Sequence, residues 1–336
     1  MDTFLDDLTT TLDTALGAAG TLRLTEVDRR GEGNSWETYL VGVKWDGGEA
    51  DYAVKRRPLS GIVAEYDVER EVALLGAAAS LGLPVPAVIT HDPELARGFF
   101  VMAKVTGAIP LPGTVTRLVP AERREPLGRQ IARAMALLHA ADPAALGLER
   151  LGPVPAADRT GARESAEWAG HYREVADIRT PILDLALAWL EHRADRVSGR
   201  VALVHNDFRI GNLVVRDDGL AAVLDWETAH FSDPAADIAW FAQRTSRGRS
   251  PLLCKLIALE PFLDEYEAAA GWRPSAETLT WWAVQSLTKT AIGCLQAVRV
   301  YNRGERDDLR YAAMANSVYY SLGWLGQMLR DGEWGK

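Results

Sequence analysis

Apolar and polar residues alternate in short runs along the first third of the chain, which is the pattern of a half-buried sheet. Residues 38–45 and 51–55 are two such runs, and residues 46–48, Asp-Gly-Gly, stand between them. An Asp-Gly pair between two runs of this kind is a strong signal for a β-hairpin. Residues 99–105 are more densely apolar, as in a buried strand. We therefore predict that residues 21–105 form strands together with one helix.

Helical periods dominate the remainder of the chain. Residues 120–140 repeat apolar side chains every three or four positions, which predicts one amphipathic helix. Its inward-facing residues are Leu127, Ile131, Met135 and Leu138. Residues 281–285, 291–300 and 309–329 also indicate helices, and their aromatic side chains belong either to the core or to a substrate pocket. His139 is expected to pack at a helix end rather than to act as a catalyst.

Polar side chains interrupt short apolar runs in the segment 201–225. Residues 201–204 lead into a polar turn that carries Asp207 and Asn212, and Asp225 follows the next apolar runs. Transfer of a phosphoryl group from a nucleotide needs a carboxylate to orient the attacking hydroxyl and oxygen ligands to hold magnesium. Asp207 fits the first role, and Asn212 and Asp225 fit the second. Either residue type alone is an ordinary turn former, but the set of three favours the catalytic interpretation.

The spacing H-x-D-x-x-x-x-N, from His205 to Asn212, with Asp225 one short hairpin later, resembles the aminoglycoside phosphotransferase and choline kinase family, which shares the protein kinase fold. The resemblance implies a base-like role for Asp207 and magnesium contacts for Asn212 and Asp225. It also implies that His205 supports the loop. Many members of the family have glycine where this chain has Asn206, so we expect the backbone to be held differently there.

Residues 224–240 extend the resemblance. Their sequence, LDWETAHFSDPAADIAW, is similar to the subgroup that includes phosphotransferase domains fused to acyl-CoA dehydrogenases, and less similar to the antibiotic-resistance enzymes. Asp237 lies where the family typically has an aspartate that braces the catalytic loop from the start of a helix. An N-cap of a helix from Ile238 onward explains Asp237 equally well, and both interpretations make it a structural support.

Two features of the N-terminal part suit the phosphates of a nucleotide. Lys55 ends a predicted strand and, by the same resemblance, grips the α- and β-phosphates; an exposed lysine at a strand end is the alternative. Ahead of the hairpin lies a loop of small residues whose main-chain N–H groups can approach phosphates. That role depends on the resemblance and on Lys55 following at the right distance. The loop residues are Gly31, Gly33, Asn34 and Ser35.

A helix predicted over residues 61–80 carries the acidic partner of the lysine. The candidates are Glu65, Glu69 and Glu71. The resemblance favours Glu71, and Glu69 stays open because helix positions three or four apart share a face. Glu65 and Asp67 fit a solvated acidic face.

The dense apolar strand is the candidate adenine site, because in kinase-like folds the adenine ring stacks against such a strand and bonds to its main chain. The candidate residues are Met102, Ala103, Lys104 and Val105. A purely structural strand followed by a linker would have the same sequence. Main-chain contacts do not distinguish ATP from GTP, so both nucleotides fit this expectation.

Composition narrows the class of protein. The chain has 336 residues, a formal net charge of −9 and dispersed basic residues, which argues against a nonspecific nucleic-acid binder. Its two cysteines form no C-x-x-C motif and suit a reducing compartment. The first residues lack the positive start and apolar core of a secretory signal, and no apolar run is long enough to span a bilayer. We therefore expect a cytoplasmic protein without membrane attachment.

Together these patterns predict an α+β protein with the two-lobe fold of protein kinases. Residues 1–105 are expected to form a nucleotide-binding lobe with an antiparallel sheet and one main helix, and residues 106–336 a larger, mostly helical catalytic lobe. The predicted activity is transfer of the γ-phosphoryl group of ATP, with Mg²⁺, to a hydroxyl of a small molecule. Two alternatives stay open: a nucleotide-binding regulatory module, and a kinase-fold enzyme that attaches the nucleotide to a protein. The sequence names neither the acceptor nor the oligomeric state.

Overall fold

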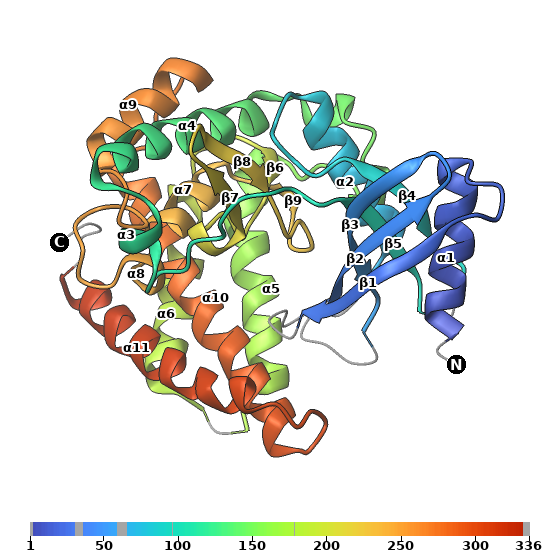
Figure 1. Cartoon of the computed structure of the whole chain (residues 1–336). Coiled ribbons are helices and arrows are strands. Elements are labelled where there is room, and N and C mark those ends of the chain that lie inside the picture. The colour runs from blue at the N-terminus through green and yellow to red at the C-terminus, as the bar shows by residue number, and fades with distance from the viewer. Residues whose placement is uncertain (1–2, 31–35, 59–65, 96, 178, 332–336) are drawn as a thin grey trace. The chain divides into compact units, whose positions relative to one another are not determined.

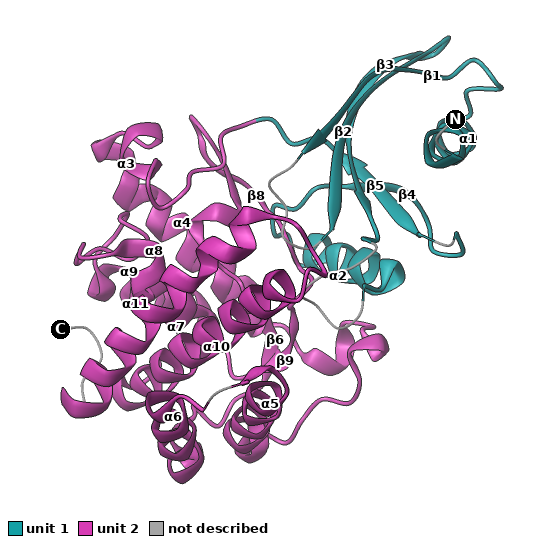
Figure 2. Ribbon diagram, turned by 90° about the horizontal axis from the view of Figure 1, so that it is seen from below, with its two compact units in different colours: residues 1–106 teal, residues 107–336 magenta. Residues whose placement is uncertain are grey.

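The computed structural model describes residues 3–30, 36–58, 66–95, 97–177 and 179–331. The chain divides between Thr106 and Gly107 into two compact units, which Figure 2 colours separately. Among the described residues, no helix is both long and apolar enough to cross a membrane.

Unit 1, residues 1–106, contains a five-stranded antiparallel sheet (Figure 1). The predicted hairpin is confirmed, because β2 pairs with β3 in a register that places Trp45 opposite Gly48 and leaves two residues for the turn. The dense apolar run is confirmed as β5, which is almost entirely buried. In the spatial order of the sheet, the strands are β1 (Arg23–Arg30), β2 (Glu37–Trp45), β3 (Gly48–Arg56), β5 (Phe99–Ala103) and β4 (Val88–Asp92).

The sequence predicts no element before residue 21, but the structure has helix α1 (Thr3–Leu16) there. Phe4, Leu8 and Leu12 recur every four positions and therefore share one helix face. All three are buried in the core that α1 forms with the sheet. The ring of Phe4 lies 5.7 Å from that of Phe99 in β5, in an edge-to-face arrangement.

Helix α2 (Val68–Ser80) is the described part of the helix predicted over residues 61–80. Its N-cap is Asp67, whose side chain accepts hydrogen bonds from the main-chain N–H of Glu69 at 3.0 Å and of Arg70 at 3.2 Å. The expectation that Asp67 belongs to a solvated acidic face is therefore wrong. The first N–H groups of a helix have no partner within it, and the Asp67 carboxylate satisfies two of them.

Unit 2, residues 107–336, is mostly helical, with two short two-stranded sheets (Figure 1). The apolar runs predicted around the polar turn are strands: β7 (Leu213–Arg216) pairs with β8 (Gly219–Val223). The first run, β6 (Ala202–Val204), pairs instead with β9 (His230–Ser232), a strand that the sequence does not predict. The helices are α3 (Val115–Leu118), α4 (Ala121–Ala140), α5 (Thr160–Val175), α6 (Pro181–His192), α7 (Ala235–Ala242), α8 (Arg244–Arg247), α9 (Leu259–Ala270), α10 (Ala276–Asn302) and α11 (Leu309–Asp331).

Two helices show how far the periodicity was informative. In α4, all four residues predicted to face inward are buried. By contrast, α10 is one helix of 27 residues where the sequence indicates two separate segments. Trp281 and Trp282 of α10 are fully buried, so the core interpretation of these aromatic residues is confirmed.

Gly107 brings the chain close to β7 at the start of unit 2. Its φ is +144°, and a Cβ atom there would lie 2.6 Å from Val214 Cγ1 and 2.8 Å from the Val215 carbonyl oxygen. Only glycine permits this approach. The next residue, Ala108, exchanges two main-chain hydrogen bonds with Val215, at 2.9 and 2.8 Å. This segment is therefore anchored on the strand that follows the polar turn.

Candidate active site

The polar turn is a loop of eight residues between β6 and β7, which we call loop 205–212. Asp237 fixes where the loop begins, because its carboxylate accepts hydrogen bonds from the main-chain N–H of His205 at 2.8 Å and of Asn206 at 2.7 Å. Nε2 of His139 lies 3.1 Å from the same carboxylate. Although burial alone would raise the pKa of Asp237, its hydrogen bond with His139 and the positive charge there hold that pKa below the ordinary value.

Helix α7 starts at Ala235 and has Pro234 as its N-cap. The alternative that Asp237 caps a helix from Ile238 onward is therefore wrong, and the bracing contacts agree with the resemblance. His139 is buried as expected, with Nδ1 2.9 Å from the hydroxyl of Tyr266. The His139 ring thus links Asp237 to Tyr266 and holds the Asp237 carboxylate in place.

His205 is buried beneath the loop. Its Nε2 atom lies 2.9 Å from the carbonyl oxygen of Leu224, and its Nδ1 atom accepts a hydrogen bond from the main-chain N–H of Asp207 at 3.2 Å. This pair of contacts requires the neutral tautomer with its proton on Nε2. Burial lowers the pKa of His205 and so favours that neutral ring. The histidine thereby links loop 205–212 to the end of β8.

Asn206 has a φ of +62°, in the left-handed region. This conformation costs most residues other than glycine roughly 1–2 kcal/mol, and asparagine is one of the few that tolerate it. The Nδ2 atom of Asn206 donates to the carbonyl oxygen of Thr228 at 3.3 Å, and Oδ1 accepts from Nζ of Lys289 at 2.7 Å. The departure from glycine is thus accompanied by two contacts that glycine cannot make.

The carboxylate of Asp207 is held by three side chains. Asn212 donates from Nδ2 to Oδ2 at 2.6 Å, and Trp240 donates from Nε1 to Oδ1 at 2.7 Å. Arg209 donates from Nε to the same carboxylate, at 3.0 and 3.2 Å from its two oxygens. The structure therefore brings two of the predicted residues, Asp207 and Asn212, into direct contact.

The β7–β8 hairpin brings the chain back to loop 205–212 at Asp225. The main-chain N–H of Leu224, its neighbour, donates to the carbonyl oxygen of Asn212 at 2.8 Å. The charge of Asp207 is the largest cause of the raised pKa of Arg209, and the charge of Asp225 contributes to the same shift. The two predicted carboxylates, Asp207 and Asp225, therefore both act on the Arg209 guanidinium.

The chemistry of the donor set suits a hard cation. Asn212 and Asp225 offer an amide and a carboxylate oxygen, the ligand types that Mg²⁺ prefers. Because Nδ2 of Asn212 is committed to Asp207, the amide oxygen is the atom left for a ligand role. In the described parts of the chain, no cluster of three or more His, Cys, Asp or Glu side chains could hold a metal ion. A Mg²⁺ ion bound through nucleotide phosphates takes only one or two protein ligands, so the prediction for Asn212 and Asp225 does not require a larger cluster.

Among the nucleotide residues predicted in unit 1, Lys55 lies on β3, Glu71 on α2, and Met102 and Ala103 on β5, while Lys104 and Val105 follow that strand. Lys55 is half-buried within β3, opposite Phe100 of β5, so it is not an exposed strand end. Glu71 is only 5% exposed and Glu69 is half-buried. The Glu71 carboxylate lies 3.5 Å from Nη1 of Arg70, an ion pair that compensates its burial, and its pairing with Lys55 stays a prediction. Glu65 lies outside the described residues.

Main-chain donors in the predicted adenine segment are partly engaged within unit 1. The N–H of Ala103 donates to the main-chain carbonyl oxygen of Ala87 at 2.8 Å, and the N–H of Lys104 donates to the main-chain carbonyl oxygen of Asp51 at 3.3 Å. Met102 is buried in β5, and Val105 follows the strand. The predicted phosphate loop, with Gly31, Gly33, Asn34 and Ser35, lies outside the described residues.

Three side chains around the loop are absent from the predicted set. Arg209 and Trp240 contact Asp207, and Lys289 contacts Asn206. A sequence signal existed for Trp240, because it follows Asp237 by three positions in α7 and therefore shares its helix face. Lys289 had no local signal, since its partner is 83 residues away in the chain.

A buried ion pair supports the segment after Asp225. Glu164 accepts hydrogen bonds from Nε2 of His230 at 2.8 Å and from the hydroxyl of Ser232 at 2.7 Å. Nδ1 of His230 lies 3.0 Å from the carbonyl oxygen of Thr228, so both ring nitrogens face acceptors and the ring must carry two protons. Although burial alone would lower the pKa of His230, the charge of Glu164 raises it.

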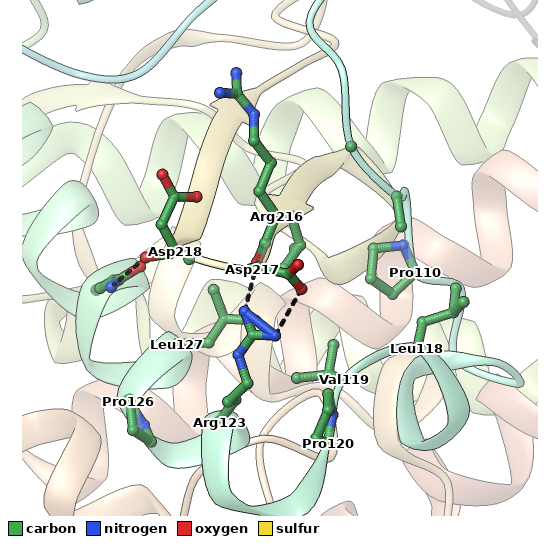
Figure 3. Close-up of a pocket in the computed structure, with 15 residues that line it drawn as sticks. Pro110, Leu118, Val119, Pro120, Arg123, Pro126, Leu127, Arg216, Asp217 and Asp218 are labelled. Atoms are coloured by element: carbon green, nitrogen blue, oxygen red, sulfur yellow. Dashed lines mark hydrogen bonds and ion pairs between the residues drawn. The ribbon is translucent and has the colours of Figure 1, made fainter.

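A separate cavity of about 710 Å³ lies beside α4 and the β7–β8 turn (Figure 3). Arg123 extends toward this turn and donates to the carboxylate of Asp217 at 2.8 Å. The side chains of Pro110, Leu118 and Val119 form an apolar part of the wall. None of the predicted catalytic or metal residues lines this cavity.

An antiparallel sheet with a helical remainder, and an Asp–Asn loop followed by a hairpin and a second aspartate, define the kinase-like class of phosphotransferase folds. The model of the phosphotransferase enzyme family matches residues 26–279. The chain belongs to this family.

Solved structures share the fold. A protein from Ralstonia eutropha JMP134, described as an aminoglycoside phosphotransferase, is 20% identical, with a TM-score of 0.73 over 92% of this chain and 93% of that one. An aminoglycoside phosphotransferase in ternary complex with ADP and hygromycin B is 15% identical, with a TM-score of 0.67 over 99% and 98%.

Curated relatives are much longer proteins. Acyl-CoA dehydrogenase family member 11 of Rattus norvegicus is 28% identical over 202 residues, which cover 57% of this chain and 25% of the relative. The chain spans about a quarter of the length of that relative. The similarity to acyl-CoA dehydrogenase proteins agrees with the subgroup that residues 224–240 indicate.

Proposed function

We propose that this protein transfers the γ-phosphoryl group of ATP to a hydroxyl of a small molecule, with Mg²⁺ as cofactor. The contact between Asp207 and Asn212 carries the proposal, because it joins a candidate base to a candidate metal ligand within one loop. Asp225 joins them through the bond between Leu224 and Asn212. Membership of the phosphotransferase enzyme family supports the reaction class, and the ADP bound by a structural neighbour supports the nucleotide.

In the proposed reaction, Asp207 orients the acceptor hydroxyl and takes up its proton. The hydroxyl oxygen forms a new bond to the γ-phosphorus of ATP, the bond between that phosphorus and the β–γ bridging oxygen breaks, and ADP leaves. The donors from Asn212 and Trp240 fix the direction of the Asp207 carboxylate. Asn212 and Asp225 would hold Mg²⁺, which when bound neutralises charge on the phosphates.

Residues of unit 1 have the nucleotide roles in the proposal. Lys55, oriented by Glu71, pairs with the α- and β-phosphates, and the loop that contains Gly31 and Gly33 covers them. Main-chain atoms of residues 102–105 hydrogen-bond the base. GTP fits the same contacts and belongs in the same assay.

Asp207→Ala tests the central assignment, with Asp218→Ala in the exposed β7–β8 turn as the matched control. Each protein is incubated with Mg·ATP and a panel of an aminoglycoside, choline, a sugar and a hydroxyacyl thioester, and transfer is read by mass spectrometry. Asp207→Ala should abolish transfer, and titration calorimetry should show nearly unchanged ATP binding. Asp218→Ala should behave as the wild type. Transfer by Asp207→Ala at the wild-type rate would overturn the assigned mechanism.

The same measurements separate the alternatives. Magnesium-dependent ATP binding without transfer to any acceptor favours a regulatory module. When a protein acceptor is added to the panel, a mass increase equal to a nucleoside monophosphoryl group, with release of pyrophosphate, favours nucleotide transfer.

A further inference from the structure

Lys289 is a buried lysine in the middle of α10. Its Nζ atom donates to the main-chain carbonyl oxygen of Asn206 and, at 2.7 Å, to Oδ1 of the same residue. The ammonium group also lies 4.0 Å from the centre of the Trp240 ring, which is a cation–π contact. An ammonium group that leaves water needs such partners, so this lysine is directed at the loop and not at solvent.

Asn206 has several polar groups in use. Its main-chain N–H donates to Asp237 at 2.7 Å, and its side-chain amide donates to Thr228 at 3.3 Å. Both of its oxygens accept from Lys289. Because its φ of +62° is unfavourable for a residue with a side chain, these contacts hold a conformation that the chain would otherwise leave.

Two routes lead from Lys289 to Asp207. Asn206 precedes Asp207 in the chain, so the backbone conformation of Asn206 sets the direction in which the Asp207 side chain points. Trp240, beneath the ammonium group, donates from Nε1 to Asp207 at 2.7 Å. Both neighbours of Lys289 therefore act on the same carboxylate.

We infer that Lys289 is a positioning residue for Asp207, and that its ammonium group holds Asn206 in the left-handed conformation that transfer requires. The inference rests on the proposed function of Asp207. It assigns to α10 a role in the reaction beyond packing.

The charge of Lys289 is open to titration in an accessible pH range. Burial lowers the pKa of Lys289 to about 8, against the charges of Asp207, Glu164, Asp237 and Glu167, which raise it. His230 is the cationic neighbour on the other side of Glu164. The ammonium form, and with it the contact to Asn206, should therefore be lost progressively above pH 8.

Lys289→Met keeps the length and apolar stem of the side chain and removes the charge. Misplacement of a reacting group by about 1 Å lowers rates about 100-fold, so we expect kcat to fall by about 10- to 100-fold. The KM for the acceptor and the Kd for ATP should stay within about threefold of the wild type, since neither contact is proposed for Lys289. Lys289→Arg should recover part of kcat and remove any fall in kcat near pH 8, because arginine stays charged.

Asn206→Gly tests the contact from the loop, and glycine adopts the left-handed conformation without steric cost. Combined with Lys289→Met, it should add little to the loss of kcat, because the bond between Lys289 and Oδ1 that Asn206→Gly removes is already absent in Lys289→Met. Should Lys289→Met fail to fold, Asn206→Gly alone decides: a kcat reduced by several fold with unchanged KM supports the inference.

The inference is overturned by wild-type kcat in folded Lys289→Met or, when only the loop variant folds, in Asn206→Gly. Losses of kcat that multiply in the double variant overturn it equally. Hydrogen exchange of the amides in loop 205–212 separates this result from a failure of the proposed function. If the wild type transfers no phosphoryl group, the proposed function fails, and exchange that is faster in Lys289→Met still supports the structural coupling. Unchanged exchange excludes the coupling itself.

Discussion

Arg209 holds both carboxylate oxygens of Asp207 from a single nitrogen, Nε, at 3.0 and 3.2 Å. Trp240 adds a second donor to Oδ1, and Asn212 adds a second donor to Oδ2. A carboxylate has about four lone-pair positions, so these contacts occupy it fully. An acceptor hydroxyl must displace one donor to reach Asp207. Arg209, whose side chain is 39% exposed, is more accessible than Asn212, which is buried.

Arg209→Met should lower kcat by about tenfold without raising the KM for the acceptor. The variant loses a contact that orients Asp207, but it also loses the donor that competes with the acceptor. Steady-state kinetics with the best acceptor of the panel measure both effects. Arg216→Met, an exposed arginine at the end of β7, is the control and should be neutral. A raised KM with unchanged kcat would show that Arg209 binds the acceptor instead.

Asp237→Asn should reduce both stability and turnover. The Asp237 carboxylate faces two main-chain N–H groups and Nε2 of His139, and an amide in its place turns an N–H toward one of these donors. A buried donor without an acceptor costs about 1–3 kcal/mol, which urea denaturation should detect. The disturbed donors belong to His205 and Asn206, so kcat should also fall.

Asp233→Asn separates these two effects. Asp233 is a buried carboxylate that accepts hydrogen bonds from Ser198 and Ala235, and none of the described residues that donate to it belongs to loop 205–212. It should lose stability and keep kcat. Equal losses of kcat in both variants would mean that turnover follows stability alone.

The His230–Glu164 pair should make stability depend on pH. The raised pKa of His230 contributes stability that is complete below its ordinary value and is lost as pH rises through the folded value. Burial opposes ionisation of Glu164, but His230 lowers its pKa overall, so the Glu164 contribution is lost as pH falls through its own folded value. The difference in unfolding free energy between wild type and His230→Gln should therefore be largest at about pH 5–6.5.

Urea denaturation at several pH values measures this difference. His171→Gln changes a histidine on the same helix as Glu164 whose side chain is 45% exposed, and it should show little difference at any pH. A gap between wild type and His230→Gln that widens as pH rises above 7 contradicts the predicted sign.

Asp67→Ala should loosen the helix that carries Glu71. Loss of an N-cap costs about 1 kcal/mol, because the N–H groups of Glu69 and Arg70 lose their acceptor. Hydrogen exchange of the first-turn amides of α2 should accelerate, whereas Asp67→Asn, which retains an acceptor, should keep most of the protection. Identical exchange in all three proteins would exclude capping as the role of Asp67.

Local patterns were enough to predict β2, β3 and β5 of unit 1 and to place Asp207 and Asn212 in one polar turn. Two adjacent residues, Asp46 and Gly47, specify the hairpin turn. Asp207 and Asn212 are only five positions apart, so the conformation of the loop between them is enough to bring them into contact. Helix α1 was not predicted, although the spacing of Phe4, Leu8 and Leu12 is helical.

Features that depend on contacts between residues distant in the chain could not be predicted from the sequence. Buried Thr288 and Lys289 interrupt the apolar period of α10, so the sequence indicates two segments where one helix exists. Lys289 is tolerated in the interior because Asn206 and Trp240, distant in the chain, compensate its charge. Strand β9 has three residues and depends on pairing with β6, which no local pattern reveals. The roles of Lys55, Glu71 and residues 102–105 stay predictions.

The β7–β8 hairpin keeps Asn212 and Leu224 within one hydrogen bond, while its turn, at Asp217 and Asp218, lies at the opposite end. Extra residues inserted at that tip lengthen the chain between Asn212 and Asp225 and leave the paired end unchanged. Related chains can therefore differ in the number of residues between these two positions while the two side chains keep the same arrangement in space. A search for relatives that fixes the interval between these two positions passes over such chains.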